Sequence, residues 1–214
     1  MTVLITKPRY DDTTAYLSEW SKEVTDNCKD RGIKILEVEN ENVNKITVEN
    51  FIKSQNPTFL VFNGHGDPET IYGQHNKPLL SVEDLDKDVV SEKIIHSFSC
   101  SSASILGTEC INAGCKTFIG YDNEFIFIID TTRSTQPLKD ESAKPFLESA
   151  NQVVISIIKG NEIGEAFEMS QAKYDKWIEY YNAHYPEEAP HILPWLIWDK
   201  IHQVILGQKN FKVY

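Results

Sequence analysis

The sequence lacks the features that mark several large classes of protein. No apolar run approaches the roughly 18 residues that a membrane-spanning helix needs, and lysine and arginine form no stripe. The chain has 21 basic and 32 acidic residues, a formal net charge of −11, whereas phosphate binding needs clustered positive charge. We therefore expect neither a membrane nor a nucleic acid as a partner.

Cysteine is scarce, and its spacing does not suit a metal. The four cysteines are Cys28, Cys100, Cys110 and Cys115. They form no CxxC pair and no cysteine–histidine cluster of zinc spacing, so we expect free thiols, no metal and no cofactor. The first residues, MTVLITKPRY, lack the basic and long apolar segments of a signal peptide. They predict a first strand and a cytoplasmic location.

The chain alternates short apolar runs with amphipathic segments over its first 120 residues. Its 214 residues, 41% of them apolar, suit one α/β domain over residues 1–214. The expected strands are 3–6, 33–38, 58–62, 93–99 and 117–120, with a small hairpin at 71–80. The expected helices are 12–31, a short one capped by Thr47, 82–89, one capped by Ser101 and Ser102, 142–159 and 163–183. This alternation predicts a mostly parallel sheet with helices on both faces.

Two later segments are harder to assign. The run FIFII, residues 125–129, fits a strand buried on both faces. The run WLIWDKIHQVIL, residues 195–206, is interpreted as a closing strand or hairpin, with a buried helix as the alternative.

Two reactive side chains follow the third and fourth expected strands. His65 stands in Asn-Gly-His-Gly after the third, and Cys100 stands in Ser-Cys-Ser-Ser after the fourth. Ligands of parallel α/β sheets bind beyond the carboxyl ends of the strands. If these strands are neighbours, an imidazole and a thiol emerge on one edge, where the imidazole can promote the reactive thiolate. A helix beginning at Ser101 would favour the thiolate further.

The glycine after the histidine adds a second element of such a site. Gly66 has no side chain, so its backbone N–H can approach a substrate closely. With the N–H of Cys100 it could hold the oxyanion of a tetrahedral intermediate. His96, by contrast, falls within a buried strand and is expected to be a hydrogen-bonded core residue.

The segments VFNGHGD and IIHSFSCSS together resemble the two catalytic blocks of caspase-like cysteine peptidases (clan CD). The resemblance is nearer to the CHAT (separase-like), clostripain and gingipain branches than to animal caspases. It extends to ILGTECINAGCKTFIGYDNEF and to LPWLIWDKIHQVILG, which is similar to the family's last hairpin. The resemblance implies a caspase-like three-layer fold, Cys100 as nucleophile, His65 as general base and acid, and Gly66 and Cys100 as oxyanion-hole donors. It also implies a protein or peptide substrate.

Some relatives in these branches cleave after a basic residue by means of an acidic pocket. Asp122 and Asp130 lie after the fifth strand, where this pocket is expected, and are the candidates for binding Arg or Lys. Solvated loop carboxylates are the alternative for each. The polar stretch 130–144 contains basic residues and could be cleaved by the enzyme itself. The sequence shows no sensor module, so a separate protein partner or ligand could control the enzyme.

Three functions remain open from sequence alone. The first is an active cysteine endopeptidase, and the second is an inactive caspase-like binding or regulatory module. The third is a cysteine amidase acting on small molecules. The intact cysteine–histidine pair favours the first and the third.

Overall fold

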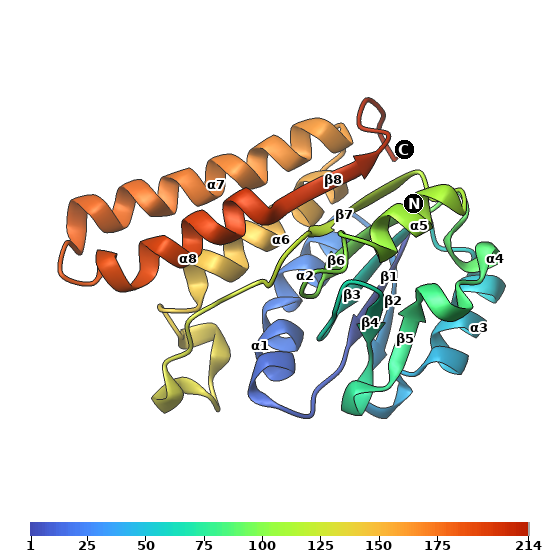
Figure 1. Ribbon diagram of the computed structural model, residues 1–214, viewed down its shortest axis with the longest axis horizontal. Coiled ribbons are helices and arrows are strands. Elements are labelled where there is room, and N and C mark those ends of the chain that lie inside the picture. The colour runs from blue at the N-terminus through green and yellow to red at the C-terminus, as the bar shows by residue number, and fades with distance from the viewer. Residues whose placement is uncertain (214) are drawn as a thin grey trace.

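The computed structural model describes residues 1–213 and shows one central sheet between layers of helices (Figure 1). The six strands lie in the order β2-β1-β3-β6-β7-β8. They are β1 (Thr2–Lys7), β2 (Lys34–Glu39), β3 (Phe59–Asn63), β6 (Ile94–Phe98), β7 (Thr117–Tyr121) and β8 (Gln203–Gly207). All pairs are parallel except β7 with β8. The predicted α/β class with a mostly parallel sheet is confirmed.

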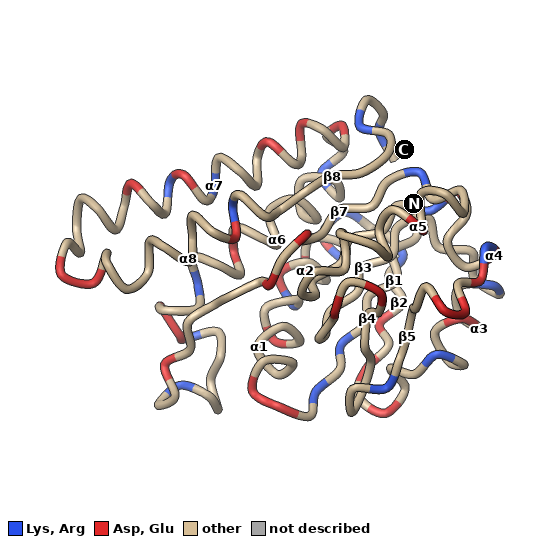
Figure 2. The backbone as a smooth tube through the Cα atoms, in the orientation of Figure 1, with Lys and Arg blue, Asp and Glu red and all other residues tan. Residues whose placement is uncertain are grey.

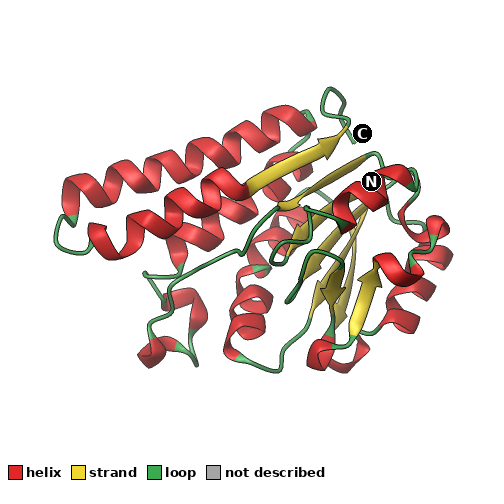
Figure 3. Ribbon diagram, in the orientation of Figure 1, coloured by secondary structure: helices red, strands yellow, loops and turns green. Residues whose placement is uncertain are grey.

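Helices cover both faces of the sheet (Figure 3). On one face lie α1 (Asp12–Trp20), α2 (Lys22–Asp30) and α6 (Lys144–Ile158). On the other lie α3 (Lys45–Gln55), α4 (Lys87–Val90) and α5 (Leu106–Asn112), with a hairpin of β4 (Thr70–Tyr72) and β5 (Pro78–Ser81). The long α7 (Ile163–His184) and α8 (Ala189–His202) pack outside α6. Short 3-10 helices occupy Asn40–Asn42, Gln74–Asn76, Val82–Asp84, Thr131–Arg133 and Pro137–Lys139.

The central strands are buried on both faces, which explains their continuous apolar sequences. In β3, for example, Leu60 packs with the α3 and α5 side, while Phe59 and Val61 pack with α2 and α6. Such a core fixes the register of neighbouring strands, because a shift by one residue would exchange the two faces. The turns that follow the strands are therefore held in fixed relative positions.

Three helix boundaries differ from the predicted ones. The expected helix 82–89 is a 3-10 helix, Val82–Asp84, followed by α4, which Asp86 caps. The expected helix 12–31 is divided at Ser21, which ends α1 and precedes α2. The Ser21 hydroxyl donates to the carbonyl of Ser18 at 2.7 Å, a local bond that competes with the helical pattern and bends helices. The cap of α3 is Asn44 and not Thr47, because the Asn44 side chain accepts from the Thr47 amide at 3.0 Å.

The two ambiguous segments also resolve differently. Residues 125–129 are not a strand but an irregular, half-buried segment. The place beside β7 is taken by β8, which arrives from the end of the chain and pairs antiparallel with it. The segment 195–206 is a helix as far as His202 and a single strand from Gln203. The predicted hairpin is therefore wrong. The helix alternative holds as far as His202, and the closing strand holds from Gln203.

His96 is fully buried in β6, as predicted, but it has no hydrogen-bond partner among the described residues. Its burial lowers the pKa of the imidazole to about 3, because the charged form would lose its hydration. The predicted hydrogen bond is therefore wrong. The ring packs at a steep angle against Phe98, with centroids 5.8 Å apart.

Charged residues of both signs are interspersed along the chain (Figure 2). Within residues 1–213, none of the helices combines the length and apolarity that a bilayer crossing would require. Over the same residues, histidine, cysteine and acidic side chains do not gather in the groups of three or more that could hold a metal ion.

Candidate active site

The turns after β3 and β6 meet at the carboxyl edge of the sheet. The two strands are parallel neighbours, and Asn63 at the end of β3 lies opposite Phe98 at the end of β6. His65 and Cys100 each follow two residues later. The Gly64 amide donates to the Phe98 carbonyl at 3.3 Å, which continues the pairing into the turns. The expectation that these two strands are neighbours is confirmed.

Gly66 allows the two turns to touch. A Cβ atom at this position would lie 2.8 Å from the carbonyl oxygen of Cys100 and 2.8 Å from the Cβ of Ser99. Real Cβ atoms do not approach other atoms so closely, so any larger residue would push the turns apart. Gly66 also faces Ile71 across an isolated antiparallel bridge. Among the backbone bonds of the described turns, neither the Gly66 amide nor the Cys100 amide acts as a donor.

The imidazole of His65 pairs with a carboxylate that the sequence analysis did not single out. The Nε2 atom of His65 lies 2.8 Å from Oδ2 of Asp11. Asp11 follows β1, which is the other neighbour of β3. The Tyr10 ring packs edge-on against the imidazole, with centroids 6.2 Å apart. Because Asp11 holds Nε2, the other ring nitrogen, Nδ1, remains for the thiol and the substrate.

Asp11 is itself fixed as the N-cap of α1. Its Oδ1 accepts from the amide of Thr14 at 2.8 Å and from the hydroxyl of Thr14 at 2.7 Å. Burial opposes ionisation of the carboxyl, but the bonds from Thr14 and His65 outweigh it and lower the pKa of Asp11. The carboxylate is therefore charged where it meets the imidazole. The sequence signal was present, since Asp-x-x-Thr directly after a first strand is a capping pattern.

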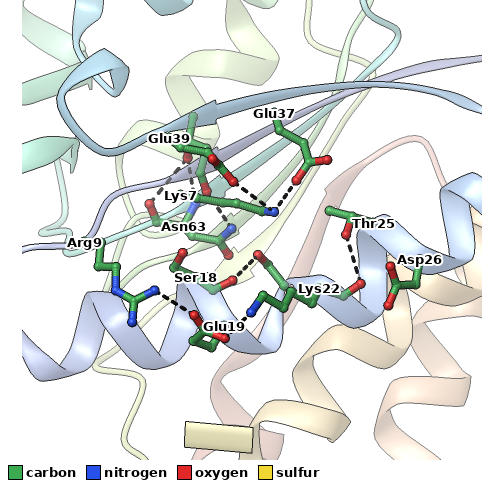
Figure 4. A network of polar contacts seen from close by, with 12 residues as sticks. Lys7, Arg9, Ser18, Glu19, Lys22, Thr25, Asp26, Glu37, Glu39 and Asn63 are labelled. Atoms are coloured by element: carbon green, nitrogen blue, oxygen red, sulfur yellow. Dashed lines mark hydrogen bonds and ion pairs between the residues drawn. The ribbon is translucent and has the colours of Figure 1, made fainter. Parts of the chain in front are cut away.

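Ion pairs fix the end of β1, from which the Asp11 loop departs (Figure 4). Lys7 is almost fully buried and pairs with Glu37 of β2. Arg9, which is exposed, extends to Glu19 on α1, with 2.6 Å between Nη1 and Oε1. A buried ammonium group needs such a partner, since burial removes its hydration. The loop is thus tied both to the sheet and to the first helix.

Cys100 differs from the other cysteines, which are fully buried, in being half-exposed at the sheet edge. The next residue, Ser101, has the left-handed φ of +55°, an unusual conformation for a serine that turns the chain sharply after the thiol. Its amide donates to the carbonyl of Asn123 at 2.8 Å. The thiol points to the carbonyl oxygen of Phe125, 3.8 Å from Sγ.

The expected helix cap at Ser101 and Ser102 is wrong. Residues 101–105 form turns, and α5 begins only at Leu106, without a side-chain cap. The Ser102 hydroxyl instead lies beneath the turn and donates to the Ser97 hydroxyl at 2.8 Å. Cys100 therefore gains no stabilisation from a helix N-terminus, and its pKa is raised and not lowered. Burial is the main cause, and the carboxyls of Glu124 and Asp199 add to it.

The thiol and the imidazole thus have separate partners. Within residues 1–213 no hydrogen bond joins Cys100 to His65, because Sγ faces Phe125 and Nε2 faces Asp11. In cysteine and serine hydrolases such contacts often tighten only when substrate is bound. The two turns are in contact, while the two side chains are bonded elsewhere.

The two candidate specificity residues lie apart from each other. Asp122 follows β7 directly, and its Oδ1 lies 2.7 Å from Nδ1 of His202 on α8. Asp130 caps the 3-10 helix Thr131–Arg133 by accepting from the Thr132 amide at 2.9 Å. The bonds from Thr132 lower the pKa of Asp130. Each carboxylate therefore has a partner within the chain.

Besides Asp11, sequence reasoning missed a second carboxyl, that of Asp199, which raises the pKa of the Cys100 thiol. Asp199 on α8 is fully buried, and only its Oδ1 has a partner, the Ile126 amide at 2.9 Å. Burial raises the pKa of Asp199 well above its ordinary value. Its signal in the sequence is a single acidic residue within the apolar run WLIWDKI.

No protein-family model and no curated protein matches the sequence. The structure does have counterparts among solved structures. One is the crystal structure of the Arg-specific cysteine proteinase gingipain R, with a TM-score of 0.62 over 99% of this chain and 10% sequence identity. The chain spans 47% of the length of that neighbour. At this identity the likeness concerns the fold, and the fold of this chain is the caspase-like α/β sandwich.

Proposed function

We propose that this chain is a cysteine endopeptidase that cleaves protein substrates through an acyl-enzyme on Cys100, with His65 as the proton carrier. The observation that carries the proposal is the contact between the two turns, in which Gly66 packs directly on the backbone of Cys100. Asp11 supports it, because a charged carboxylate behind an imidazole is how many hydrolases orient their base.

The geometry supports the following sequence of steps. Nδ1 of His65 accepts the thiol proton, and the Cys100 sulfur attacks the carbonyl carbon of the substrate peptide bond. The amides of Gly66 and Cys100 donate to the oxyanion that forms. The imidazolium then protonates the leaving amine as the C–N bond breaks, which leaves a thioester. Water, deprotonated by His65, attacks the thioester and releases the acid, and the thiol regains a proton.

Preference for Arg or Lys before the cleaved bond is a further part of the proposal. Asp122 is the stronger candidate, because the next residue, Asn123, is bonded to Ser101 beside the nucleophile. Asp130 is the other candidate, and the neighbour of similar fold is described as Arg-specific. Asp122→Asn and Asp130→Asn should be compared on matched peptides with arginine or glutamine before the bond. A selective rise in KM for arginine identifies the residue, and an unchanged ratio for both variants refutes the assignment.

Self-cleavage in residues 130–144 is also proposed. Arg133 and Lys139 are exposed there, as a cleavable loop requires. After prolonged incubation, mass spectrometry should find two fragments of the wild-type chain, cut within residues 130–144, and an uncut Cys100→Ala chain. A wild-type chain that stays uncut contradicts self-cleavage. Control by a protein partner or ligand is likewise proposed, and such a partner should raise the rate of peptide hydrolysis.

The proposal is tested by peptide hydrolysis with four proteins. These are the wild type, Cys100→Ala, His65→Ala and the matched control His75→Ala. His75 suits the comparison because it too pairs with a carboxylate, Glu41 at 2.9 Å, and contacts Tyr10. We expect hydrolysis of a fluorogenic peptide panel to be lost in the first two variants and retained in the control.

Three results would overturn the proposal. One is hydrolysis that persists in Cys100→Ala, which would assign the activity to another group or to a contaminant. A second is hydrolysis of small amides only, with no peptide of the panel cleaved, which would favour the amidase. The third is the absence of any hydrolysis with Cys100 chemically intact and accessible, which would favour an inactive binding module.

A further inference from the structure

The segment 122–126, which we call the strap, crosses the sheet edge over the nucleophile. The Cys100 thiol donates to the Phe125 carbonyl oxygen, 3.8 Å from Sγ, and the Ser101 amide donates to the Asn123 carbonyl at 2.8 Å. The strap therefore lies against the turn that carries the thiol. The Phe125 carbonyl oxygen occupies one side of the sulfur.

Helix α8 holds the strap from the other side. The Trp198 indole donates to the Glu124 carbonyl at 2.8 Å, and the Ile126 amide donates to Oδ1 of Asp199 at 2.9 Å. Both bonds go to strap backbone, so they depend on its path and not on its side chains.

His202, one turn further along α8, adds two more bonds at the start of the strap. Its carbonyl accepts from the Asp122 amide at 3.0 Å, and its Nδ1 lies 2.7 Å from Oδ1 of Asp122. Trp198, Asp199 and His202 lie within the last turns of one helix and together fasten the strap at its start, its middle and its end.

A single peptide group links the nucleophile to this helix. The carbonyl of Phe125 faces the thiol, while the N–H of the same peptide unit, that of Ile126, faces Asp199. The Phe125 ring is wedged between Phe98 and Tyr121, with centroids 4.8 and 4.7 Å away. The packed ring and the bonded peptide group therefore fix the position of the carbonyl oxygen that faces the thiol.

We propose that the strap is an autoinhibitory segment, and that Trp198, Asp199 and His202 of α8 form the latch that keeps it closed over Cys100. Release of the strap from α8 uncovers the thiol and allows it to meet the His65 imidazole. The inference rests on the proposed peptidase function, since it describes the regulation of the same site. It also accounts for a thiol and an imidazole that sit on touching turns yet have separate partners.

The latch is tested by the accessibility of Cys100, which does not require catalysis. Trp198→Phe keeps an aromatic ring beside His202 and removes the N–H donor together with one ring of the indole, a loss of volume that the control shares. Trp195→Phe is the matched control, because Trp195 lies on the same helix and is 41% exposed. The second-order rate of iodoacetamide alkylation at Cys100 is measured by peptide mass spectrometry, with Cys28, Cys110 and Cys115 as buried internal references.

We expect alkylation of Cys100 to be about three- to tenfold faster in Trp198→Phe than in the wild type or in Trp195→Phe, the change in opening that the loss of one net hydrogen bond produces. Asp199→Leu should have a larger effect, about tenfold or more, because it leaves the Ile126 amide unpaired. Hydrogen exchange at the Ile126 amide gives a second readout. It should be slow in the wild type and accelerated in parallel with alkylation.

Peptide hydrolysis, measured on the same samples, separates this proposal from the proposed function. Equal alkylation and equal exchange in all variants overturn the latch, even if peptides are cleaved. Faster alkylation without any hydrolysis supports the latch and refutes the peptidase. Faster alkylation together with faster hydrolysis supports both. A variant with lowered thermal stability is judged by the exchange of the Ile126 amide relative to core amides, which distinguishes strap opening from general loosening.

Discussion

Replacing Asp11 by asparagine removes the charge behind the His65 imidazole and leaves the rest of the site in place. Asparagine is as good an N-cap as aspartate, so the bond from the Thr14 amide is retained. The neutral amide cannot stabilise the positive charge that His65 acquires when it takes the thiol proton. The substitution therefore probes the orienting carboxylate and not the stability of α1.

The structure sets the size of the expected effect. A hydrogen bond to a charged group contributes about 1.5–3 kcal/mol, but His65 and Asp11 have side chains that are 34% and 38% exposed. Water screens pairs of this kind, so about 1–1.5 kcal/mol is a reasonable estimate. Since about 1.4 kcal/mol corresponds to a tenfold change in rate, kcat/KM should fall roughly 5- to 15-fold. The decrease should lie in kcat, because Asp11 does not contact substrate.

The assay is steady-state hydrolysis of the best peptide substrate by Asp11→Asn and by Asp12→Asn. Asp12 is the adjacent exposed carboxylate on the same helix and does not contact His65. The midpoint of thermal unfolding should be equal in both variants. If Asp11→Asn retains kcat/KM within twofold of Asp12→Asn, or if its loss lies in KM, the orienting role of Asp11 is refuted.

The remaining predictions concern packing and protonation. Gly66→Ala should lower the rate of peptide hydrolysis at least tenfold, because its Cβ would lie 2.8 Å from the Cys100 carbonyl oxygen. A tenfold change corresponds to about 1.4 kcal/mol of activation free energy. Hydrolysis at the wild-type rate would contradict the close contact. Burial lowers the pKa of His96 to about 3, whereas an unfolded chain binds this proton near pH 6.5. The free energy of unfolding should therefore decrease as pH falls below about 6.5, by about 2 kcal/mol at pH 5. In urea unfolding His96→Leu should lose this dependence and the exposed control His191→Leu should keep it; the reverse pattern would show that His96 is not buried and neutral. The raised pKa of Asp199 gives a pH dependence of the opposite sign. The carboxyl ionises at lower pH in the unfolded chain than in the native one, so native stability falls as pH rises. Asp199→Asn should therefore be more stable than the wild type by about 1–3 kcal/mol at pH 7, and by less at pH 4. An equal effect at both pH values would show that Asp199 ionises normally.

The sheet and the positions of His65 and Cys100 could be predicted from the sequence because they depend on local patterns. β1 and β3 carry continuous apolar runs, and β3 and β6 are followed by turns of small and polar residues. Parallel strands joined by helices place their carboxyl ends on one edge. These local patterns suffice to predict that both residues lie at the same edge of the sheet, as they do.

Features that depend on distant parts of the chain could not be predicted. The run FIFII has the composition of a strand, but β8 occupies the place beside β7, and Phe125 packs on Phe98 instead. The closing segment changes from helix to strand at Gln203, where pairing with Tyr121 begins. Tertiary contacts of this kind override local propensity.

The environment of the nucleophile was also beyond sequence reasoning. Serines after Cys100 suggested a helix cap, but the Ser102 hydroxyl bonds to Ser97 of the preceding strand and α5 begins later. The carboxyls of Asp11 and Asp199 approach the site from positions 89 residues before and 99 residues after the cysteine. Only the order of strands in the sheet brings the first of them to His65.

The most direct test of the account is the covalent labelling of Cys100 by a peptide acyloxymethyl ketone that carries arginine next to the reactive group. Intact-protein and peptide mass spectrometry should find one label, on Cys100, and its rate should fall at least tenfold in His65→Ala but not in His75→Ala. A label on Cys28, Cys110 or Cys115, or a rate at Cys100 that does not depend on His65, would contradict the cysteine–histidine pair on which the proposed function depends.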